Sequence, residues 1–308
     1  MQPENNPYYP LVSIITVNYN NTGVTCALLA SLRKISYPNF EVIIVDNASV
    51  ESPVAAIAEV FPTAKVISSP VNKGFAGGNN LGILAATGSY LFLVNNDTEF
   101  TEGLIEGLLE VFDKHPDAGI VSPKFHYYFE PGTIEYAGYN AVDMLTGRNS
   151  MIGCKEKDNG QYDATTETNY AHGGAMMIPR AAMDKVGLMP ELYFLYYEEF
   201  DWCEQFKRKG YKIYYQYKSL IYHKESMTTG KNSPLKTYYL TRNRLLFMRR
   251  NVKLPARVFF MLYFTFLTVP KNTLQFILKR ETVHLKAFWK GIMWNIKHLK
   301  PNTNPCVA

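Results

Sequence analysis

Acidic residues are nearly absent from the last quarter of this 308-residue chain. Residues 231–308 contain 15 Lys and Arg but one acidic residue, whereas residues 1–230 contain 17 Lys and Arg and 26 acidic residues. A strongly basic segment implies an anionic partner, which is either a nucleic acid or an anionic lipid surface. Because bulky apolar residues are interleaved with these charges, we expect a lipid surface and no nucleic acid.

Paired cysteines and long apolar runs are also missing. The four cysteines, Cys26, Cys154, Cys203 and Cys306, form no CxxC pair and no metal-ligand spacing, which predicts reduced thiols in a cytosolic compartment. The first residues lack a basic stretch followed by an apolar run, so we expect no signal peptide. The longest apolar run, 258–269, has 12 residues, and a membrane span needs about 20. The sequence therefore predicts no spanning helix.

Residues 11–121 alternate between strand and helix patterns. Short β-branched or apolar runs occupy 12–19, 42–46 and 90–94, and helical spacing marks 24–35, 55–61, the segment after Gly74 and 104–112. This alternation predicts an α/β fold with an open, doubly wound, mostly parallel sheet. In such sheets, ligands bind beyond the carboxyl ends of the strands.

Polar side chains gather where three of these strands end. Asn18 and Asn20 follow the first strand, Asp46 and Asn47 the second, and Asn95, Asn96 and Asp97 the third. Each cluster alone is also typical of turns and helix caps. Three clusters at one predicted edge favour a binding site.

The segment 72–80, NKGFAGGNN, opens a predicted helix. Backbone N–H groups at a helix start can bind a phosphate, and glycine lets the backbone come close. The alternative is a glycine-rich helix that packs tightly on the sheet. At the end of the third strand, Asp97 has two interpretations as well: a Mg²⁺ ligand that acts together with donor phosphates, or a turn residue.

An acidic cluster, Glu198, Glu199 and Asp201, lies at the start of a helix predicted over 201–209. Carboxylates at a helix N-terminus are favourable by about 0.3–1 kcal/mol, which explains one or two of the three acids. Residues two apart on a helix face different directions, so Glu199 and Asp201 are not expected to serve one atom. His223 follows a predicted strand at 211–217. A lone histidine such as His223 or His172 is more often structural than a ligand.

These motifs together resemble glycosyltransferase family 2, of the GT-A fold, and most closely its rhamnosyltransferase-like bacterial members. The resemblance covers roughly residues 11–250, and its motifs are VSIITVNYN, VIIVDNAS, NKGFAGGNN, LFLVNNDT, GGAMMIPR, LYFLYYEEFDWCEQFKRKGYKIYY and YYLTRNRL. We expect a GT-A catalytic domain over residues 1–245 and a basic, amphipathic helical region over 246–308.

The resemblance implies a role for each motif. The residues expected to bind the nucleotide sugar are Asn18, Asn20, Asp46, Asn47, Asn72, Lys73, Gly74, Asn79, Asn96 and Arg242. The tripeptide at 95–97 stands in the place of the family's DxD motif, so Asp97 is the expected ligand of Mg²⁺ or Mn²⁺. His223 matches a metal-binding histidine of several relatives. The family's Glu-Asp pair aligns with Glu198 and Glu199, so Glu199 is the expected base and Asp201 the alternative.

The implied reaction is an inverting, metal-dependent hexosyl transfer from dTDP-rhamnose or a UDP-sugar to a hydroxyl of a lipid-linked saccharide. Because Asn95 replaces the first Asp of the DxD motif, a catalytically inactive nucleotide-sugar-binding module is the alternative. A nucleotidyltransferase would need paired metal-binding carboxylates, and only Asp97 is evident. A processive polysaccharide synthase is disfavoured, because the chain has no spanning helix and no QxxRW motif.

Apolar residues recur at helical spacing from Leu285 onward. They are Phe288, Trp289, Ile292, Met293, Ile296 and Leu299, flanked by Lys286, Lys290, Lys297 and Lys300. A helix of this kind lies in the membrane interface. We therefore expect a cytoplasmic protein that is peripheral at the inner face of the cell membrane. The alternative is that these helices pack on the catalytic domain or form a homodimer interface.

Overall fold

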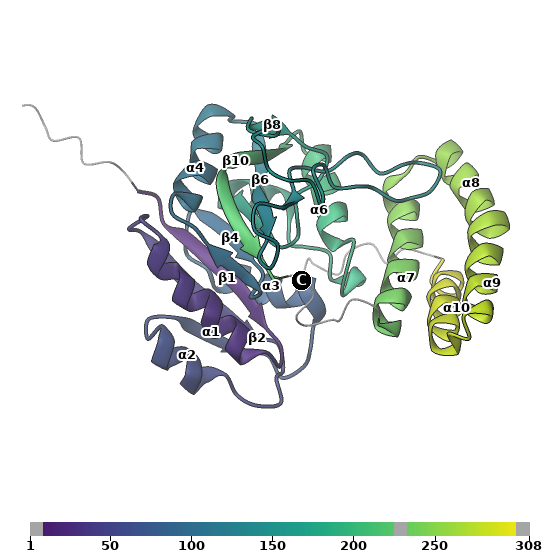
Figure 1. The fold of residues 1–308 in the computed structure, drawn as a ribbon, viewed down its shortest axis with the longest axis horizontal. Coiled ribbons are helices and arrows are strands. Elements are labelled where there is room, and N and C mark those ends of the chain that lie inside the picture. Colours follow the sequence, from purple (N-terminus) through teal and green to yellow (C-terminus); the bar gives the residue numbers. More distant parts are fainter. Residues whose placement is uncertain (1–8, 225–232, 300–308) are drawn as a thin grey trace, which may run out of the picture.

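A computed structural model describes residues 9–224 and 233–299. Its centre is one ten-stranded sheet with the strand order β3-β2-β1-β4-β9-β6-β10-β5, in which β7 also pairs with β6 and β8 with β10. Helices cover the sheet, and a separate group of helices, α7–α10, stands beside it (Figure 1). The chain thus has a sheet domain and a helical layer.

The first half of the sheet domain alternates strands and helices as the sequence predicted. The parallel strands are β1 (Val12–Asn18), β2 (Phe40–Asp46), β3 (Lys65–Ser68) and β4 (Tyr90–Val94). The helices are α1 (Thr22–Ser31), η1 (Leu32–Lys34), α2 (Val54–Val60), α3 (Gly74–Ala85) and α4 (Leu104–Lys114). The expectation of a doubly wound, mostly parallel sheet is confirmed.

Both faces of the sheet are buried. In β1, Ile15 packs into a core with α3, while Ile14 packs into a second core with α1 and α4. Successive residues of a strand point to opposite faces, so a continuous β-branched run fills both cores. This packing fixes the strand ends at one edge of the sheet.

The second half of the sheet adds antiparallel pairs. Its strands are β5 (Thr98–Phe100), β6 (Ala118–Tyr127), β7 (Ile134–Tyr136), β8 (Thr166–Glu167), β9 (Ala175–Pro179) and β10 (Lys212–His223). The helices are α5 (Arg180–Val186), η2 (Glu191–Tyr193) and α6 (Glu198–Arg208). Strand β9 runs antiparallel between β4 and β6, whereas β10 is parallel to β6.

Two predicted boundaries in this half were wrong. The strand predicted at 211–217 continues to His223, because a register irregularity between Gln216 and Leu220 lets β10 resume pairing with β6 and reach β5. The helix predicted at 201–209 begins earlier, at Glu198. The first difference matters for the site, because it places His223 opposite Thr98, one residue beyond Asp97.

The helical layer comprises α7 (Pro234–Asn251), α8 (Leu254–Tyr263), the π-helix η3 (Phe264–Thr268), α9 (Val269–Leu278) and α10 (Thr282–Lys297). The side chain of Ser233 caps α7 by accepting a hydrogen bond from the backbone N–H of Lys236. Residue 245 lies inside α7, so the helical layer begins near residue 234. Within the described ranges, no helix is both long and apolar enough to cross a membrane.

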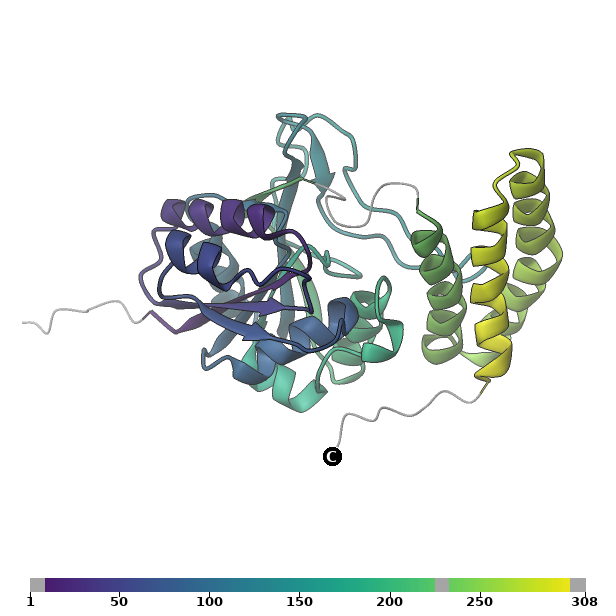
Figure 2. The same cartoon turned by 90° about the horizontal axis from the view of Figure 1, so that it is seen from below.

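Figure 2 shows α7 nearest the sheet domain, with α10 packed against it. Gly291 makes this packing close, because a Cβ atom there would lie 2.9 Å from the carbonyl oxygen of Tyr238. Phe288 and Ile292, which were predicted to face a membrane, are buried in this contact. The apolar stripe of α10 is therefore divided between the core and the surface.

Candidate active site

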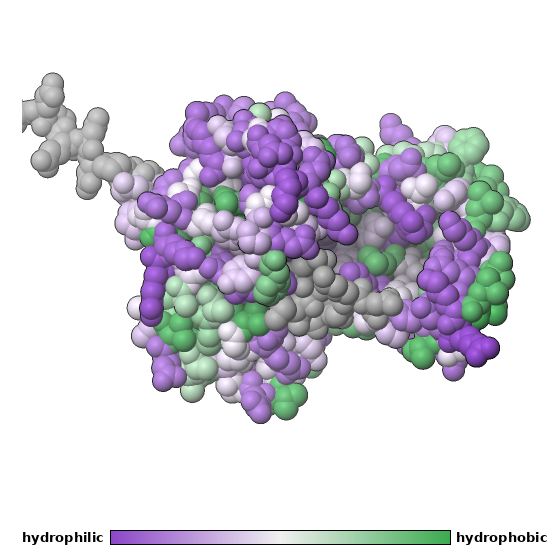
Figure 3. Space-filling model, viewed as in Figure 1, coloured by the Kyte–Doolittle hydropathy of each residue, from purple (hydrophilic) through white to green (hydrophobic). Residues whose placement is uncertain are grey.

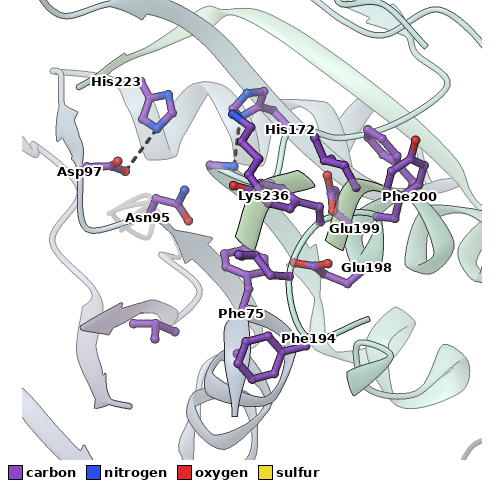
Figure 4. A pocket seen from close by; sticks show the side chains of 18 of the residues that line it. Phe75, Asn95, Asp97, His172, Phe194, Glu198, Glu199, Phe200, His223 and Lys236 are labelled. Atoms are coloured by element: carbon purple, nitrogen blue, oxygen red, sulfur yellow. Dashed lines mark hydrogen bonds and ion pairs between the residues drawn. The ribbon is translucent and has the colours of Figure 1, made fainter. Parts of the chain in front are cut away.

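A cavity of about 710 Å³ lies at the carboxyl ends of β1, β2 and β4. Its walls come from the strand ends, from the start of α3, from residues 172–174, from the loop and first turn at 194–200 and from the start of α7. Figure 4 shows Asp97 and His223 on one side of this cavity and Glu198 and Glu199 on the other. The cavity therefore lies at the edge of the sheet where the sequence predicted a binding site.

Asn47 connects the end of β2 to the loop before α3. Its Nδ2 donates to Oδ1 of Asn72 at 3.1 Å and to the carbonyl oxygen of Gly74 at 3.0 Å, and its Oδ1 accepts from the backbone N–H of Lys73 at 2.9 Å. Asn47, Asn72 and Gly74 line the cavity, and Lys73 lies between two of them. These hydrogen bonds therefore hold the start of α3 beside the cavity, and backbone N–H groups at a helix start can bind an anion.

Gly74 is required at the first position of α3. Its φ is +71°, and a Cβ atom there would lie 2.1 Å from the carbonyl oxygen of Phe194. The same carbonyl accepts a hydrogen bond of 2.7 Å from the backbone N–H of Phe75. Only glycine permits this approach, so the start of α3 and the loop before α6 are in direct contact.

Three residues that were predicted to bind the nucleotide sugar are hydrogen-bonded to one another or to Ser49, at the ends of β1 and β2 and in the loops that follow them. Asn18 donates to Asp46 at 3.0 Å, Ser49 donates to the same Oδ1 of Asp46 at 2.5 Å, and the backbone N–H of Asn20 donates to Ser49 at 2.8 Å. None of the three residues Asn18, Asn20 and Asp46 belongs to the cavity wall, although Val17 and Tyr19 do. These hydrogen bonds hold the loops that follow β1 and β2.

Asp97 and His223 meet at the cavity. The Nε2 atom of His223 lies 3.2 Å from Oδ1 of Asp97, and its Nδ1 lies 2.9 Å from Oε1 of the buried Glu135. Burial alone would lower the pKa of His223, but the hydrogen bonds to the two carboxylates outweigh it and raise this pKa to about 10. The imidazole is thus oriented by a carboxylate on one side and presented to Asp97 on the other.

The chemistry of this pair suits a divalent cation. A carboxylate oxygen and a neutral imidazole nitrogen are ligands that Mn²⁺ accepts, and the carboxylate also suits Mg²⁺. A cation would therefore take the place of the proton that the raised pKa keeps on His223. Among residues 9–224 and 233–299, no group of three or more His, Cys, Asp and Glu side chains has the arrangement of a metal site. Asp97 and His223 are therefore two candidate metal ligands, which is fewer than a site built from protein side chains alone would need.

Glu199 projects into the cavity from the first turn of α6, and its carboxyl lies 3.7 Å from the position of a Cβ atom built on Gly173. Burial raises the pKa of Glu199 to about 7. Glu198 is more deeply buried, and burial together with the charge of Glu199 holds its pKa well above the usual range. Oε2 of Glu198 has no hydrogen-bond partner among the described residues. Burial therefore favours the neutral form of both carboxyls, and the nearby charge of Glu199 adds to this effect at Glu198.

Asp201 lies outside the cavity wall. It is fully buried, its Oδ2 lies 3.0 Å from Nη2 of Arg250, and its Oδ1 accepts a hydrogen bond of 2.6 Å from Asn251. Its carboxylate therefore attaches α6 to α7. The geometry favours Glu199 over Asp201 for contact with a substrate, because the two side chains leave the helix in different directions.

Asn79 and Arg242 also lie away from the cavity wall. Asn79 donates to the carbonyl oxygen of Phe75 within α3. Arg242 stacks on Trp294, with its guanidinium carbon 4.3 Å from the ring centre, and donates to the carbonyl of Leu192. Their visible roles are structural. Asn96, in contrast, lines the cavity and donates to Thr25 at 3.0 Å.

Several residues of the wall were not predicted from the sequence. Glu135, Tyr139, Asn149, Phe194, Tyr197 and Lys236 line the cavity. The first three lie in 125–170, where the hydrophobic pattern is weakly periodic. Tyr197 stands beside the acidic cluster, but aromatic residues are so frequent there that the sequence does not single it out.

The profile of glycosyl transferase family 2 matches residues 13–187. An uncharacterized glycosyltransferase of Haemophilus influenzae is 34% identical over 111 residues, which are 36% of this chain and 37% of that protein. An N-acetylglucosaminyl-diphospho-decaprenol L-rhamnosyltransferase of Mycobacterium tuberculosis is 21% identical over 244 residues, which are 72% of this chain and 78% of the relative. The match thus spans little more than a third of the first relative and most of the second.

Solved structures resemble the whole chain. S. aureus TarS 1–349 superposes with a TM-score of 0.58 at 17% identity, covering 94% of this chain and 82% of that one. The mannosyltransferase PcManGT from Pyrobaculum calidifontis, in complex with GDP-Man and Mn²⁺, superposes with a TM-score of 0.57 at 15% identity, covering 95% and 76%. These likenesses concern the fold.

The strand order, the cavity at the strand ends and these likenesses define a protein of the GT-A glycosyltransferase fold. Because the family profile matches more than half of its residues, the chain belongs to glycosyl transferase family 2. The expected fold and the expected family are both confirmed.

Proposed function

We propose that this protein transfers a sugar from a nucleoside diphosphate donor to an acceptor hydroxyl, with inversion at the anomeric carbon and with Glu199 as the base. The observation that carries the proposal is the position of Glu199, which shares one cavity with Asp97 and with the loop at 72–74. A carboxyl with a pKa of about 7 is suited to accept a proton near neutral pH.

The proposed reaction is a single displacement. The carboxylate of Glu199 accepts the proton of the acceptor hydroxyl as the hydroxyl oxygen forms a bond to the anomeric carbon. The bond between that carbon and the donor phosphate breaks, and its electron pair stays on the nucleoside diphosphate. A Mg²⁺ or Mn²⁺ ion held by Asp97 and His223 would supply charge stabilisation to this leaving group.

The donor side of the cavity supports a nucleotide sugar. Asn47 fixes the loop at 72–74, and the N-terminal end of α3 carries the positive end of the helix dipole toward the diphosphate. The donor that we propose is dTDP-rhamnose or a UDP-sugar. The mycobacterial relative is an L-rhamnosyltransferase, which supports the first choice.

We further propose a lipid-linked saccharide as the acceptor and a peripheral contact with the membrane. Part of the apolar surface that supports this contact lies on α8 and η3, where Val258, Phe259, Met261, Leu262, Phe266 and Leu267 are 40–70% exposed. Figure 3 shows apolar side chains gathered over this end of the helical layer. Trp289, Met293 and Ile296 add the exposed part of α10.

Charge supports the same contact. Each Lys or Arg close to an anionic leaflet contributes about 1 kcal/mol, and residues 231–308 contain 15 of them with one acidic residue. An exposed apolar face with a basic flank lies in an interface rather than across it. A second copy of the chain is the other candidate for covering this face.

The second candidate function is a nucleotide-sugar-binding module without transfer activity, which the replacement of the first DxD aspartate by Asn95 favours. A product analysis separates the two. Incubation with Mn²⁺, dTDP-rhamnose or UDP-sugars and a short polyprenyl-diphosphate saccharide should yield a product whose anomeric configuration by NMR is opposite to that of the donor. Binding of a donor with neither transfer nor donor hydrolysis would support the binding module. Retention of configuration at the anomeric carbon would exclude the proposed single displacement, in which Glu199 deprotonates the acceptor.

A further inference from the structure

The loop between η2 and α6 has an unusual backbone. Three of its non-glycine residues have positive φ angles, 65° at Phe194, 68° at Tyr196 and 75° at Tyr197. Bulky residues rarely adopt this conformation, so it persists only where the surrounding structure holds it. Because α6 starts directly after Tyr197, this loop sets the direction in which Glu199 leaves the helix.

Asn243 of α7 holds the loop from behind. It is fully buried, and its Nδ2 lies 3.0, 2.7 and 2.8 Å from the carbonyl oxygens of Tyr193, Leu195 and Tyr196. Carbonyl oxygens only accept hydrogen bonds, so the amide nitrogen rather than the amide oxygen must face them. A single side-chain amide thus donates hydrogen bonds to the carbonyl oxygens along the strained part of the loop.

The same loop also contacts the donor side of the cavity. The carbonyl oxygen of Phe194 accepts a hydrogen bond of 2.7 Å from the backbone N–H of Phe75, and it leaves no space for a side chain at Gly74. A displacement of the loop would therefore move the first turn of α3 as well as the first turn of α6. The loop therefore supports both the side of the cavity formed by the start of α3 and the side formed by the start of α6.

We propose that Asn243 is a positioning residue for sugar transfer, which fixes the loop at 194–197 and thereby holds Glu199 at its distance from the donor. This proposal rests on the proposed function. Asn243 lies outside the cavity wall and acts through the backbone of the loop. A misplacement of about 1 Å between reacting groups can cost about 100-fold in rate, so the effect is measurable.

The test compares Asn243→Asp and Asn243→Ala with Asn251→Ala. The first variant keeps the size of the side chain but places an oxygen against the three carbonyls. Asn251 is the matched control, because it lies on the same helix and its Nδ2 donates at 2.6 Å to Asp201, away from the cavity. We expect both Asn243 variants to lower kcat by about 100-fold. We expect Asn251→Ala to lower the melting temperature and to keep kcat.

Two further readouts distinguish positioning from stability. In the Asn243 variants, water should reach Glu199, so the acidic limb of the kcat/KM profile should move from about pH 7 toward lower pH. Hydrogen exchange should become faster in peptides that contain Phe75 and residues 193–199, and the control should show neither change.

Equal exchange in Asn243→Asp and the wild type would overturn the proposal whatever the activity. Faster exchange with an unchanged kcat would also overturn it. If the wild type transfers no sugar while exchange changes as expected, the proposed function fails instead.

Discussion

The Nε2 atom of His223 lies 3.2 Å from Oδ1 of Asp97, although the two residues are far apart in the sequence. The irregularity in β10 produces this contact, since it lets the strand continue until His223 pairs with Thr98 in β5. The other side of the imidazole is fixed by Glu135. The side chains of Glu135, His223 and Asp97 thus form a row of carboxylate, imidazole and carboxylate, with Asp97 at the cavity.

The first prediction concerns the metal. Activity should require a divalent cation, and Asp97→Ala should abolish it without loss of the fold. Glu135→Gln, which changes the partner of His223, should weaken Mn²⁺ binding by about 10- to 100-fold. Calorimetric titration of Mn²⁺ in the presence of nucleoside diphosphate measures this. Glu110→Gln is the control, because Glu110 pairs with Lys114 and Lys218 and none of the three lines the cavity. Full turnover in excess EDTA would contradict the prediction.

The second prediction uses two glycines with the same φ of +71°. Gly74→Ala places a Cβ atom 2.1 Å from the carbonyl oxygen of Phe194, whereas Gly103→Ala meets nothing within 4 Å. Both variants should lose about 1 kcal/mol of stability from the left-handed backbone. Gly74→Ala should also lose donor binding, measured by nucleotide-induced thermal shift. Equal donor binding by the two variants would show that the contact at Phe194 does not shape the donor site.

The start of α3 was predictable because its sequence pattern is local. The strand ends, the segment 72–80 and Glu199 were all predicted from short motifs and all border the cavity, which lies at the carboxyl ends of the strands as the strand alternation predicts. Glu135 and Asn243 were not predictable. The role of Glu135 depends on its contact with His223, and the role of Asn243 on its contacts with the carbonyls of residues 193–196. Both contacts join residues far apart in the sequence, so no local motif predicts them. Arg242 was predicted at the donor; in the structure its guanidinium packs on Trp294 outside the cavity wall, a contact between α7 and α10 that no local motif reports.

The third prediction concerns pH. The pKa of Glu199 is raised to about 7 from an ordinary value of 4.5, so the folded state binds more protons than the unfolded state between these pH values. The free energy of unfolding should therefore decrease as pH rises from about 4.5 to 7. Glu199→Gln should reduce this dependence, as measured by urea denaturation at several pH values. Glu198 acts in the same direction, so part of the slope should remain. An identical slope in the variant would contradict the buried position of Glu199.

The fourth prediction concerns the membrane. A variant with both Phe259→Ser and Phe266→Ser should bind anionic vesicles at least about 100-fold more weakly, because each buried Phe side chain contributes about 1.5–3 kcal/mol. Leu84→Ser is the control, since Leu84 is exposed on α3 of the sheet domain. Added salt should weaken, but not abolish, vesicle binding by the wild type, the double variant and the control. Equal co-sedimentation of the double variant and the control would exclude α8 and η3 as the contact, and a dimer that dissociates in the double variant would favour a second copy.

The measurement that tests the central claim most directly is the single-turnover rate of sugar transfer in Glu199→Gln and Asp201→Asn, with donor affinity determined in parallel. Glu199→Gln should lower the rate by about 10²- to 10⁴-fold while it retains the donor. Asp201→Asn should instead lower the free energy of unfolding by about 3 kcal/mol, because it leaves Arg250 without its buried partner, and should transfer sugar at nearly the wild-type rate where it is folded. A full rate in Glu199→Gln, or a greater loss of rate in folded Asp201→Asn, would contradict the assignment of Glu199 as the base.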